Sequence, residues 1–212
     1  MHKIIIITIL ISCSIYSSGQ HKEELNLLQA DSTWDKETIQ IPFSFAPEIK
    51  YNGQEDIRFA KGWGDINSPG FWTYAFVWDI NLKTKPTTNF FEDNLKLYFD
   101  GLMNAVNQDT SITIPKTKTF FKEKEHKKAI TSFKGTVETY DAFRTKKMMT
   151  LNVTIESYYC TKTKKFIPLF RFSPKDFKHK AWESLNQVTL RANICNNNPV
   201  SYTHLDVYKR QI

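Results

Sequence analysis

The sequence predicts an α+β domain: one mostly antiparallel sheet of about six to seven strands with two amphipathic helices packed on it. Several stretches alternate apolar and polar residues with period two, and two other stretches repeat apolar residues with the helical period. Their order along the chain is three strands, a helix, four strands and a helix. The 212 residues suit one domain or at most two, and 41% hydrophobic residues are enough for an ordinary core.

The first three expected strands differ in their patterns. Residues 38–45 alternate, and Pro42 removes a backbone donor, so this strand is expected at an edge of the sheet. A short strand is expected at residues 57–60. Residues 71–80 are apolar on both faces, which predicts a strand in the interior of the sheet.

The first helix has a recognisable start. Asn89 is the expected N-cap, Glu92 stands three residues later as in a capping box, and the helix is expected to end near Asn107. Its apolar stripe should be buried against the sheet and comprises Phe91, Leu95, Phe99, Leu102 and Val106.

The second half of the domain is expected to be an antiparallel meander followed by a helix. Its four strands are expected at residues 111–122, 130–142, 147–160 and 165–172, divided by Lys-rich turns. The closing helix is expected to start with Ser173 as N-cap. Its buried stripe is expected to comprise Phe177, Ala181, Leu185, Val188 and Ala192.

This order of elements resembles the PsbP-like fold of photosystem lumenal proteins. In that fold a strand, a helix, an antiparallel meander and a closing helix occur in sequence. The resemblance implies a fold and no activity, because one fold serves many functions.

The first 37 residues are expected to lie outside the domain, which is expected to span residues 38–198. Residues 1–19 have the basic start, short apolar stretch and small residues of a secretory signal peptide. Cleavage is expected near Gln20. Lipidation at Cys13 is the alternative, because the preceding residues resemble a bacterial lipobox. Residues 20–37 are expected to form a loose arm, or a short helix around the apolar residues Leu25, Leu27 and Leu28.

The C-terminal residues 199–212 read as a translated sequencing adapter. One back-translation of residues 200–211 is a long inverted repeat that resembles two transposon mosaic ends joined head to head. His204 and Asp206 are therefore given no chemistry, and the position of the natural C-terminus stays open. The expected location is periplasmic or secreted, or a lipoprotein anchored at Cys13, without a transmembrane span in the mature chain.

Export permits a disulfide between Cys160 and Cys195, but the alternation of residues 147–160 argues against it. Leu151, Val153 and Ile155 face the core in this pattern, which leaves Cys160 on the opposite face, whereas Cys195 continues the inward stripe of the last helix. The two cysteines are expected to stay unpaired unless a bulge redirects one of them.

Catalytic chemistry has few candidates in this sequence. The signatures of serine hydrolases, phosphate-binding loops, zinc proteases and Cys-x-x-Cys sites are missing. The histidines His21, His126 and His179 are scattered along the chain, whereas metal sites bring several ligands to one point. No metal and no cofactor is expected.

The best catalytic candidates are three carboxylates that fall near tryptophans in the sequence. They are Asp56, Asp65 and Asp79, beside Trp63, Trp72 and Trp78. Glycosidases place two carboxylates beside aromatic rings, one as acid and one as nucleophile or base. The alternative is that the carboxylates belong to loops and strand ends and that the tryptophans fill the core.

One face of the strand at residues 71–80 also allows two interpretations. Its rings belong to Trp72, Tyr74, Phe76 and Trp78. They form either a platform for glycans or other ring-bearing ligands, or the surface on which the first helix docks.

The charge is unevenly distributed along the chain, whose formal net charge is +7. Residues 21–115 carry 8 Lys and Arg against 14 Asp and Glu, whereas residues 116–180 carry 17 against 6. Because alternate turns of a meander meet at one end of the sheet, several lysines should gather there, with Lys146 and Lys147 at the other end. The expected anion-binding residues are Lys122, Lys124, Lys127, Lys162, Lys164 and Lys165. A solvated set of Lys-rich hairpins is the alternative.

These observations predict a non-enzymatic exported bacterial domain that binds or supports an envelope component through a basic surface. The expected partners are an anionic polysaccharide, lipid headgroups or an acidic protein. Nucleic acid is not expected, because an exported protein rarely meets it and no motif that reads it is present. The alternative is a small secreted or periplasmic hydrolase, glycosidase-like, that uses the carboxylates near the tryptophans, so whether the protein is an enzyme stays open.

Overall fold

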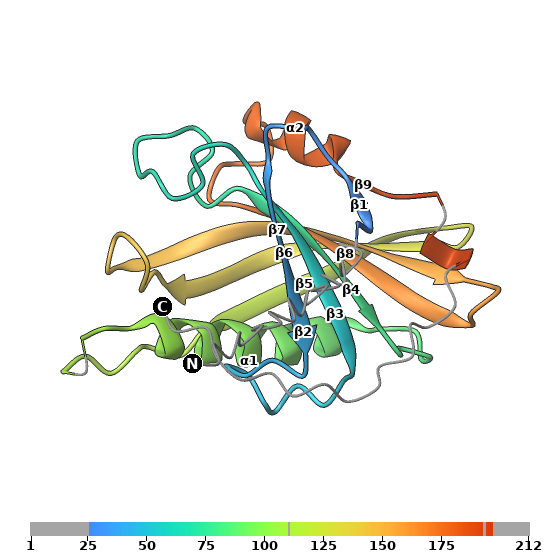
Figure 1. Ribbon diagram of the computed structural model, residues 1–212, viewed down its shortest axis with the longest axis horizontal. Helices are drawn as coiled ribbons and strands as arrows, with labels where there is room; N and C mark the ends of the chain where they lie inside the picture. The colour runs from blue at the N-terminus through green and yellow to red at the C-terminus, as the bar shows by residue number, and fades with distance from the viewer. Residues whose placement is uncertain (1–25, 110, 193, 197–212) are drawn as a thin grey trace, which may run out of the picture.

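The computed structural model describes residues 26–109, 111–192 and 194–196. They form a seven-stranded sheet, in which every neighbouring pair of strands is antiparallel, together with two α-helices (Figure 1). The predicted α+β class and the approximate order of strands and helices are confirmed.

The strands lie in the spatial order β2-β3-β4-β8-β7-β6-β5. Their bounds are β2 (Asp35–Ile41), β3 (Gly53–Phe59), β4 (Tyr74–Ile80), β5 (Lys118–Lys127), β6 (Ile130–Tyr140), β7 (Met148–Cys160) and β8 (Lys165–Ser173). β2 lies at an edge and β4 lies between β3 and β8, as the sequence predicts. The expected extension of the first strand through Pro42 to residue 45 is wrong, because β2 ends at Ile41. The order follows from the local hairpins of the meander, with β8 folded back beside β4.

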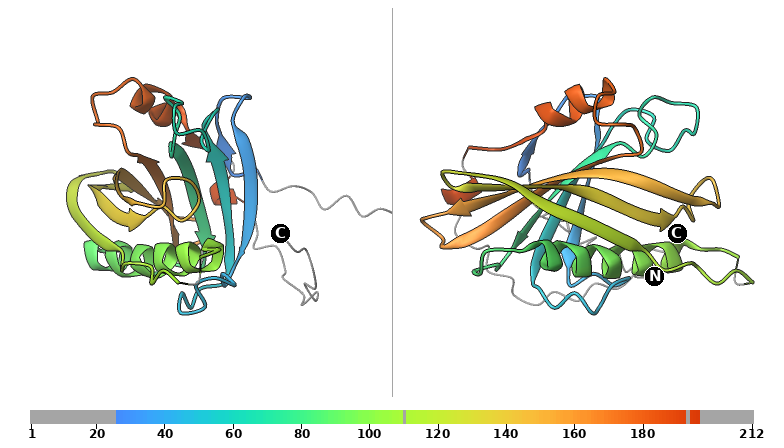
Figure 2. Two further views of the ribbon diagram at one scale, coloured as in Figure 1. Left: turned by 90° about the vertical axis from the view of Figure 1, so that its left-hand side faces the viewer. Right: turned by 180° about the vertical axis from the view of Figure 1, so that it is seen from behind.

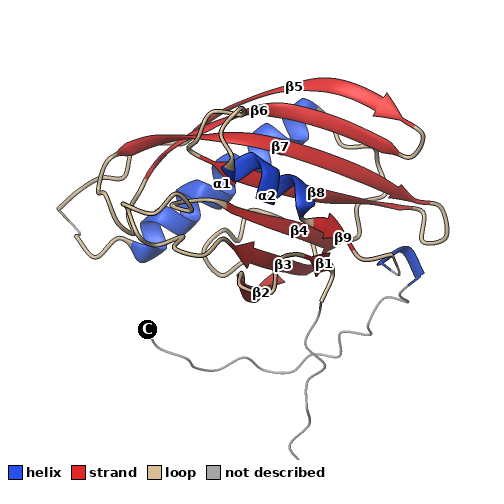
Figure 3. Ribbon diagram, turned by 90° about the horizontal axis from the view of Figure 1, so that it is seen from above, coloured by secondary structure: helices blue, strands red, loops and turns tan. Residues whose placement is uncertain are grey.

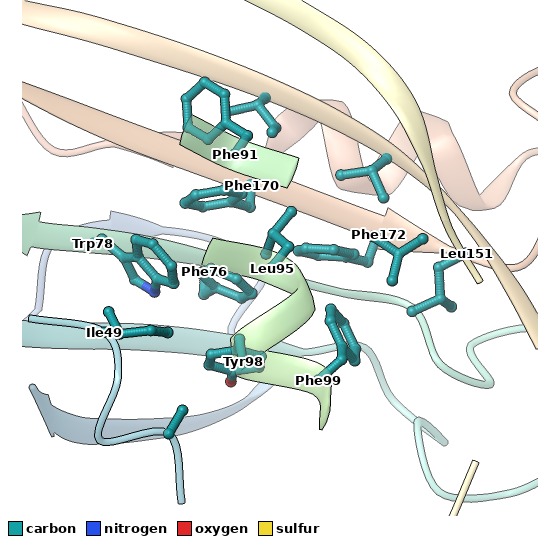
Figure 4. Packing of buried hydrophobic residues seen from close by; sticks show 14 of the residues in the cluster. Ile49, Phe76, Trp78, Phe91, Leu95, Tyr98, Phe99, Leu151, Phe170 and Phe172 are labelled. Carbon is teal, nitrogen blue, oxygen red and sulfur yellow. The ribbon is translucent and has the colours of Figure 1, made fainter. Parts of the chain in front are cut away.

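The main core lies between the sheet and helix α1 (Thr88–Val106), around which the sheet curves (Figure 2). Leu95 and Phe99 of α1 are completely buried, and the rings of Phe76, Phe170 and Phe172 pack against the helix (Figure 4). The aromatic face of β4 is therefore the surface on which the helix docks. Each ring removed from water contributes roughly 1.5–3 kcal/mol.

The start of α1 differs from the prediction. Thr87 is the N-cap, and its hydroxyl accepts the backbone N–H of Phe90 at 3.2 Å. Glu92 instead accepts the backbone N–H of Phe121 on β5 at 2.8 Å, so the carboxylate stabilises the edge of the sheet. The helix ends at the expected Asn107, whereas Leu102 and Val106 of the expected stripe are only half-buried.

The opposite face of the sheet is covered by helix α2 (Ala181–Gln187) and by the short strand pair β1 (Leu28–Gln29) and β9 (Thr189–Leu190), as Figure 3 shows from above. The buried apolar residues of this second core are Leu27, Leu28, Ala75, Val77, Cys160, Ile167, Leu169, Trp182, Leu185, Val188 and Ile194. The sheet is therefore apolar on both faces at β4 and β8, and each face has its own helix.

The second helix is shorter than predicted. Ser173 is the last residue of β8 and not a helix cap: it pairs with Asn152 of β7, and its hydroxyl lies 2.9 Å from that of Thr73. The helix begins only at Ala181. Since sheet pairing with β7 keeps Ser173 extended, the local capping signal is overridden.

The expected loose arm is docked wherever the structure describes it. Residues 26–37 contain β1 and the first part of β2, and Leu27 and Leu28 are buried. Their backbone N–H groups donate to the carboxylate of Asp56, at 2.7 and 3.1 Å. The partners of this segment lie far away in the sequence, so its own polar composition could not reveal them.

Cys160 and Cys195 form a disulfide, with their Cα atoms 5.2 Å apart, so the expectation that they stay unpaired is wrong. Cys160 points away from α1, as the alternation of β7 predicts. The error lies in the face assigned to Cys195, because the C-terminal segment packs on the second face of the sheet together with Cys160.

The disulfide predicts a measurable loss of stability when it is removed. Replacing both cysteines by alanine (Cys160→Ala with Cys195→Ala) should lower the free energy of unfolding by about 3 kcal/mol, because the bond constrains the unfolded chain. Chemical denaturation with and without dithiothreitol measures the effect. Reduction should destabilise the wild type and leave the double variant unchanged, and equal stability of oxidised and reduced wild type would contradict the prediction.

Candidate functional site

Two of the three catalytic candidates are engaged in ion pairs. Asp56 is buried and binds Arg58 through both carboxylate oxygens, while it also accepts the backbone N–H groups of Leu27 and Leu28. Asp79 forms an ion pair with Lys165 across β4 and β8. Both carboxylates lie on the second face of the sheet, and each has a cation beside it.

The third candidate, Asp65, lies apart from the other two. It is exposed in the loop between β3 and β4, where its side chain accepts the backbone N–H of Asn67 at 2.9 Å. This local bond is typical of an Asx turn. The three carboxylates are close in the sequence, but Asp65 does not share a site with Asp56 and Asp79 in the fold.

The tryptophans near these carboxylates are mainly core residues. Trp72 and Trp78 are buried, and Trp63 is half-buried against Phe59 and Phe143. A sugar needs an exposed ring to stack on, and neither Trp72 nor Trp78 offers one. Within the described ranges, no group of three His, Cys, Asp or Glu side chains could hold a metal ion.

The lysines of the meander turns do meet at one end of the sheet. Ile130, at the β5–β6 turn, pairs with Tyr158, just before the β7–β8 turn, so the two turns are neighbours. They lie together at the right of Figure 1, and the β6–β7 turn with Lys146 and Lys147 lies at the left. We call the exposed lysines of the last part of β5 and of the two neighbouring turns the basic end: Lys124, Lys127, Lys128, Lys162 and Lys164.

Most charges of the basic end are uncompensated. Lys127 pairs with the exposed Glu125 at 2.7 Å, a kind of contact that contributes little. The ion pairs among the described residues include none that involves Lys124, Lys128, Lys162 or Lys164. Their ammonium groups are thus available to an external anion.

Two of the expected anion-binding residues lie elsewhere. Lys165 points onto the second face of the sheet, where its pairing with Asp79 leaves the side chain only 16% exposed. Lys122 is exposed, but it lies further along β5, with its Nζ 5.4 Å from the ring of Phe120. Lys164 is the last residue of the β7–β8 turn and Lys165 is the first residue of β8, so the two side chains diverge although they are adjacent in sequence.

The turn backbone singles out Lys128, which the sequence-based candidates omit. Lys128 and Lys164 both adopt the left-handed conformation, with φ of 52° and 50°. Glycine or asparagine normally occupies such positions, because a Cβ atom is disfavoured there. Lys146 has the same conformation at the other end of the sheet, but its ammonium group donates to the carbonyl of Ala142 in its own turn. The sequence did contain a signal for Lys128, because it has lysine at a turn position where glycine is usual.

Glu55 is the most strongly perturbed acid, and the sequence analysis missed it. It is completely buried between β3 and α1, where its two oxygens accept the indole N–H of Trp78 at 2.6 Å and the hydroxyl of Tyr98 at 2.9 Å. Burial raises the pKa of Glu55 to about 8, and the two hydrogen bonds oppose this shift. Because both oxygens are engaged inside the core, Glu55 serves packing. The signal in the sequence was strand alternation: Glu55 lies two residues before Ile57 and four before Phe59, so it shares their core-facing side of β3.

The raised pKa of Glu55 predicts a pH-dependent stability. In the unfolded chain the pKa is 4.5, so the protonated form stabilises the fold below pH 4.5, and this contribution is lost as the pH rises to 8. Glu55→Gln stays neutral and keeps an oxygen for Trp78. From pH 4.5 to 8, the free energy of unfolding of the wild type should fall relative to this variant, by up to about 1.4 kcal/mol per pH unit.

Urea denaturation over this pH range tests the prediction. Glu183→Gln is the matched control, because Glu183 is exposed on α2 and its replacement should leave the wild-type profile unchanged. Parallel profiles of the wild type and Glu55→Gln would contradict the role assigned to Glu55.

Comparison of the chain with protein-family models, curated proteins and solved structures finds no significant match. The described residues also contain no helix that combines the length and hydropathy of a membrane span.

Proposed function

We propose that this protein is a non-enzymatic domain of the bacterial envelope that binds an anionic component through its basic end. The observation that carries the proposal is the pair of left-handed lysines, Lys128 and Lys164, in two turns that sheet pairing makes neighbours. A left-handed lysine costs conformational energy that glycine would avoid. Its presence in both turns supports selection for charge at this end.

The surroundings of these lysines favour attraction of a polyanion over a single specific ion. The side chains project from the tips of two hairpins and are exposed, so they can follow an extended ligand. At physiological ionic strength, screening acts over roughly 8 Å, and neighbouring turns can act together within that range. The association should therefore weaken steeply as salt is added.

The proposed location rests on two features. The N-terminal residues have the composition of an export signal, and the Cys160–Cys195 disulfide is of a kind that persists in oxidising compartments and is rare in the cytosol. An anionic envelope polymer is a partner that such a compartment supplies. Asp56 and Asp79, which a hydrolase would need free, are already paired with cations.

The backbone conformation provides a test that separates charge from folding. Replacing Lys128 and Lys164 by glycine removes two charges and relieves two left-handed residues, so the double variant should be at least as stable as the wild type. Its affinity for a heparin matrix at low salt should fall about fivefold. Lys146→Gly is the matched control: it makes the same change of residue at the opposite end of the sheet and should leave binding unchanged.

Salt-gradient elution measures the binding, and thermal denaturation checks each fold. A stronger variant replaces Lys124, Lys127, Lys162 and Lys164 by glutamate and should abolish retention. Unchanged elution of both the glycine and the glutamate variants would refute the proposed function.

A further inference from the structure

A groove of about 380 Å³ lies at the same end of the sheet as the basic turns. Its walls are the residues just before β3, the loop at residues 81–87 between β4 and α1, and the first turn of α1. Tyr51 and Phe90 supply its aromatic surface, and Lys83 and Lys85 supply its positive charge. This size falls within the range of small-ligand sites.

Two contacts connect the groove to the basic end. The backbone N–H of Phe166, two residues after Lys164, donates to the carbonyl of Leu82 in the groove wall at 2.7 Å. Lys85 lies 3.2 Å from Glu123 of β5, beside Lys124. The groove therefore lies next to the start of β8, directly after the β7–β8 turn, and next to β5 at Glu123.

The rings in the groove remain partly accessible. Tyr51 and Phe90 are both half-buried and pack edge to face, with their centroids 5.8 Å apart. Such a pair offers a rigid apolar surface with polar groups around it. Asn81, Thr84 and Thr87 add polar side chains to the lining.

The charge of the groove favours an acidic ligand. Lys83 is exposed and joins no ion pair with a described carboxylate. Lys85 pairs with Glu123, whose side chain is 45% exposed, so the contact is weak. The N-terminal end of the 19-residue helix α1 also faces the groove and adds a partial positive charge.

We infer that the anionic ligand of the basic end is an acidic polysaccharide, one sugar of which lies in this groove. The C–H face of the sugar packs on Tyr51 and Phe90, and its acid group faces Lys83, while the following sugars cross the basic end. This inference rests on the proposed function and specifies its ligand.

A membrane surface fits the same region less well. Insertion between lipids requires exposed apolar side chains, and the exposed large apolar residues of the described chain are Ile66, Ile112, Phe120 and Met148. None of them lines the groove or lies in the two basic turns. Rings beside hydroxyl, amide and ammonium groups are instead the combination that recognises a charged sugar.

Binding to polygalacturonate, a chain of acidic sugars, and to inorganic polyphosphate, which has charge without sugar rings, tests the inference. Tyr51→Ala and Lys83→Ser should each weaken polygalacturonate binding about tenfold at fixed salt. Tyr51→Ala should leave polyphosphate binding unchanged. Lys61→Ser is the matched control for charge, because Lys61 is exposed at the opposite end of β3.

The outcomes separate this inference from the proposed function. Failure of the wild type to bind either polymer would refute the proposed function. A second outcome is that the wild type binds both polymers and that neither Tyr51→Ala nor Lys83→Ser weakens polygalacturonate binding. This outcome would be consistent with anion binding by the basic end and would refute sugar binding in the groove. If the protein binds phosphatidylglycerol vesicles but not polygalacturonate, the inference that its ligand is an acidic polysaccharide is refuted. Lys83→Ser changes only a surface side chain, so its result does not depend on how Tyr51→Ala folds.

Discussion

Strands β4 and β8 are apolar on both faces, so the sheet is stable only if both faces are covered. Helix α1 covers one face, where Leu95 and Phe99 pack among the rings of the two strands. The other face is covered by two segments that are distant in sequence, one that contains β1 and one that runs from α2 to Ile194. Burial of apolar area supplies the driving force for both layers.

Polar groups on the second face then determine where those segments dock. Asp56 accepts the backbone N–H groups of Leu27 and Leu28, and Arg171 donates to the carbonyls of Leu185 and Val188 at the end of α2. Each buried charge thus satisfies backbone groups that would otherwise be left without partners. These contacts, with the disulfide, explain why several charged residues that look functional in the sequence are structural in the fold. On the α1 side, the buried Glu55 instead accepts hydrogen bonds from two side chains, the indole N–H of Trp78 and the hydroxyl of Tyr98.

The strand register that builds the core also arranges the surface. Pairing of Ile130 with Tyr158 places the β5–β6 and β7–β8 turns side by side, and the contact of Phe166 with Leu82 brings the groove next to them. The sheet therefore holds a region of exposed lysines at its end. Loops on a rigid scaffold are a common place for binding residues.

The sequence by itself determined the features that depend on local periodicity. These are the antiparallel meander, the burial of Leu95 and Phe99, the interior position of β4 and the meeting of alternate turns. Only the tertiary structure decided which face each segment covers. Cys195 forms a disulfide with Cys160, and Lys165 turns inward to pair with Asp79. The alternation of a strand assigns each side chain to one face of the sheet, but contacts between distant residues decide which segment covers that face.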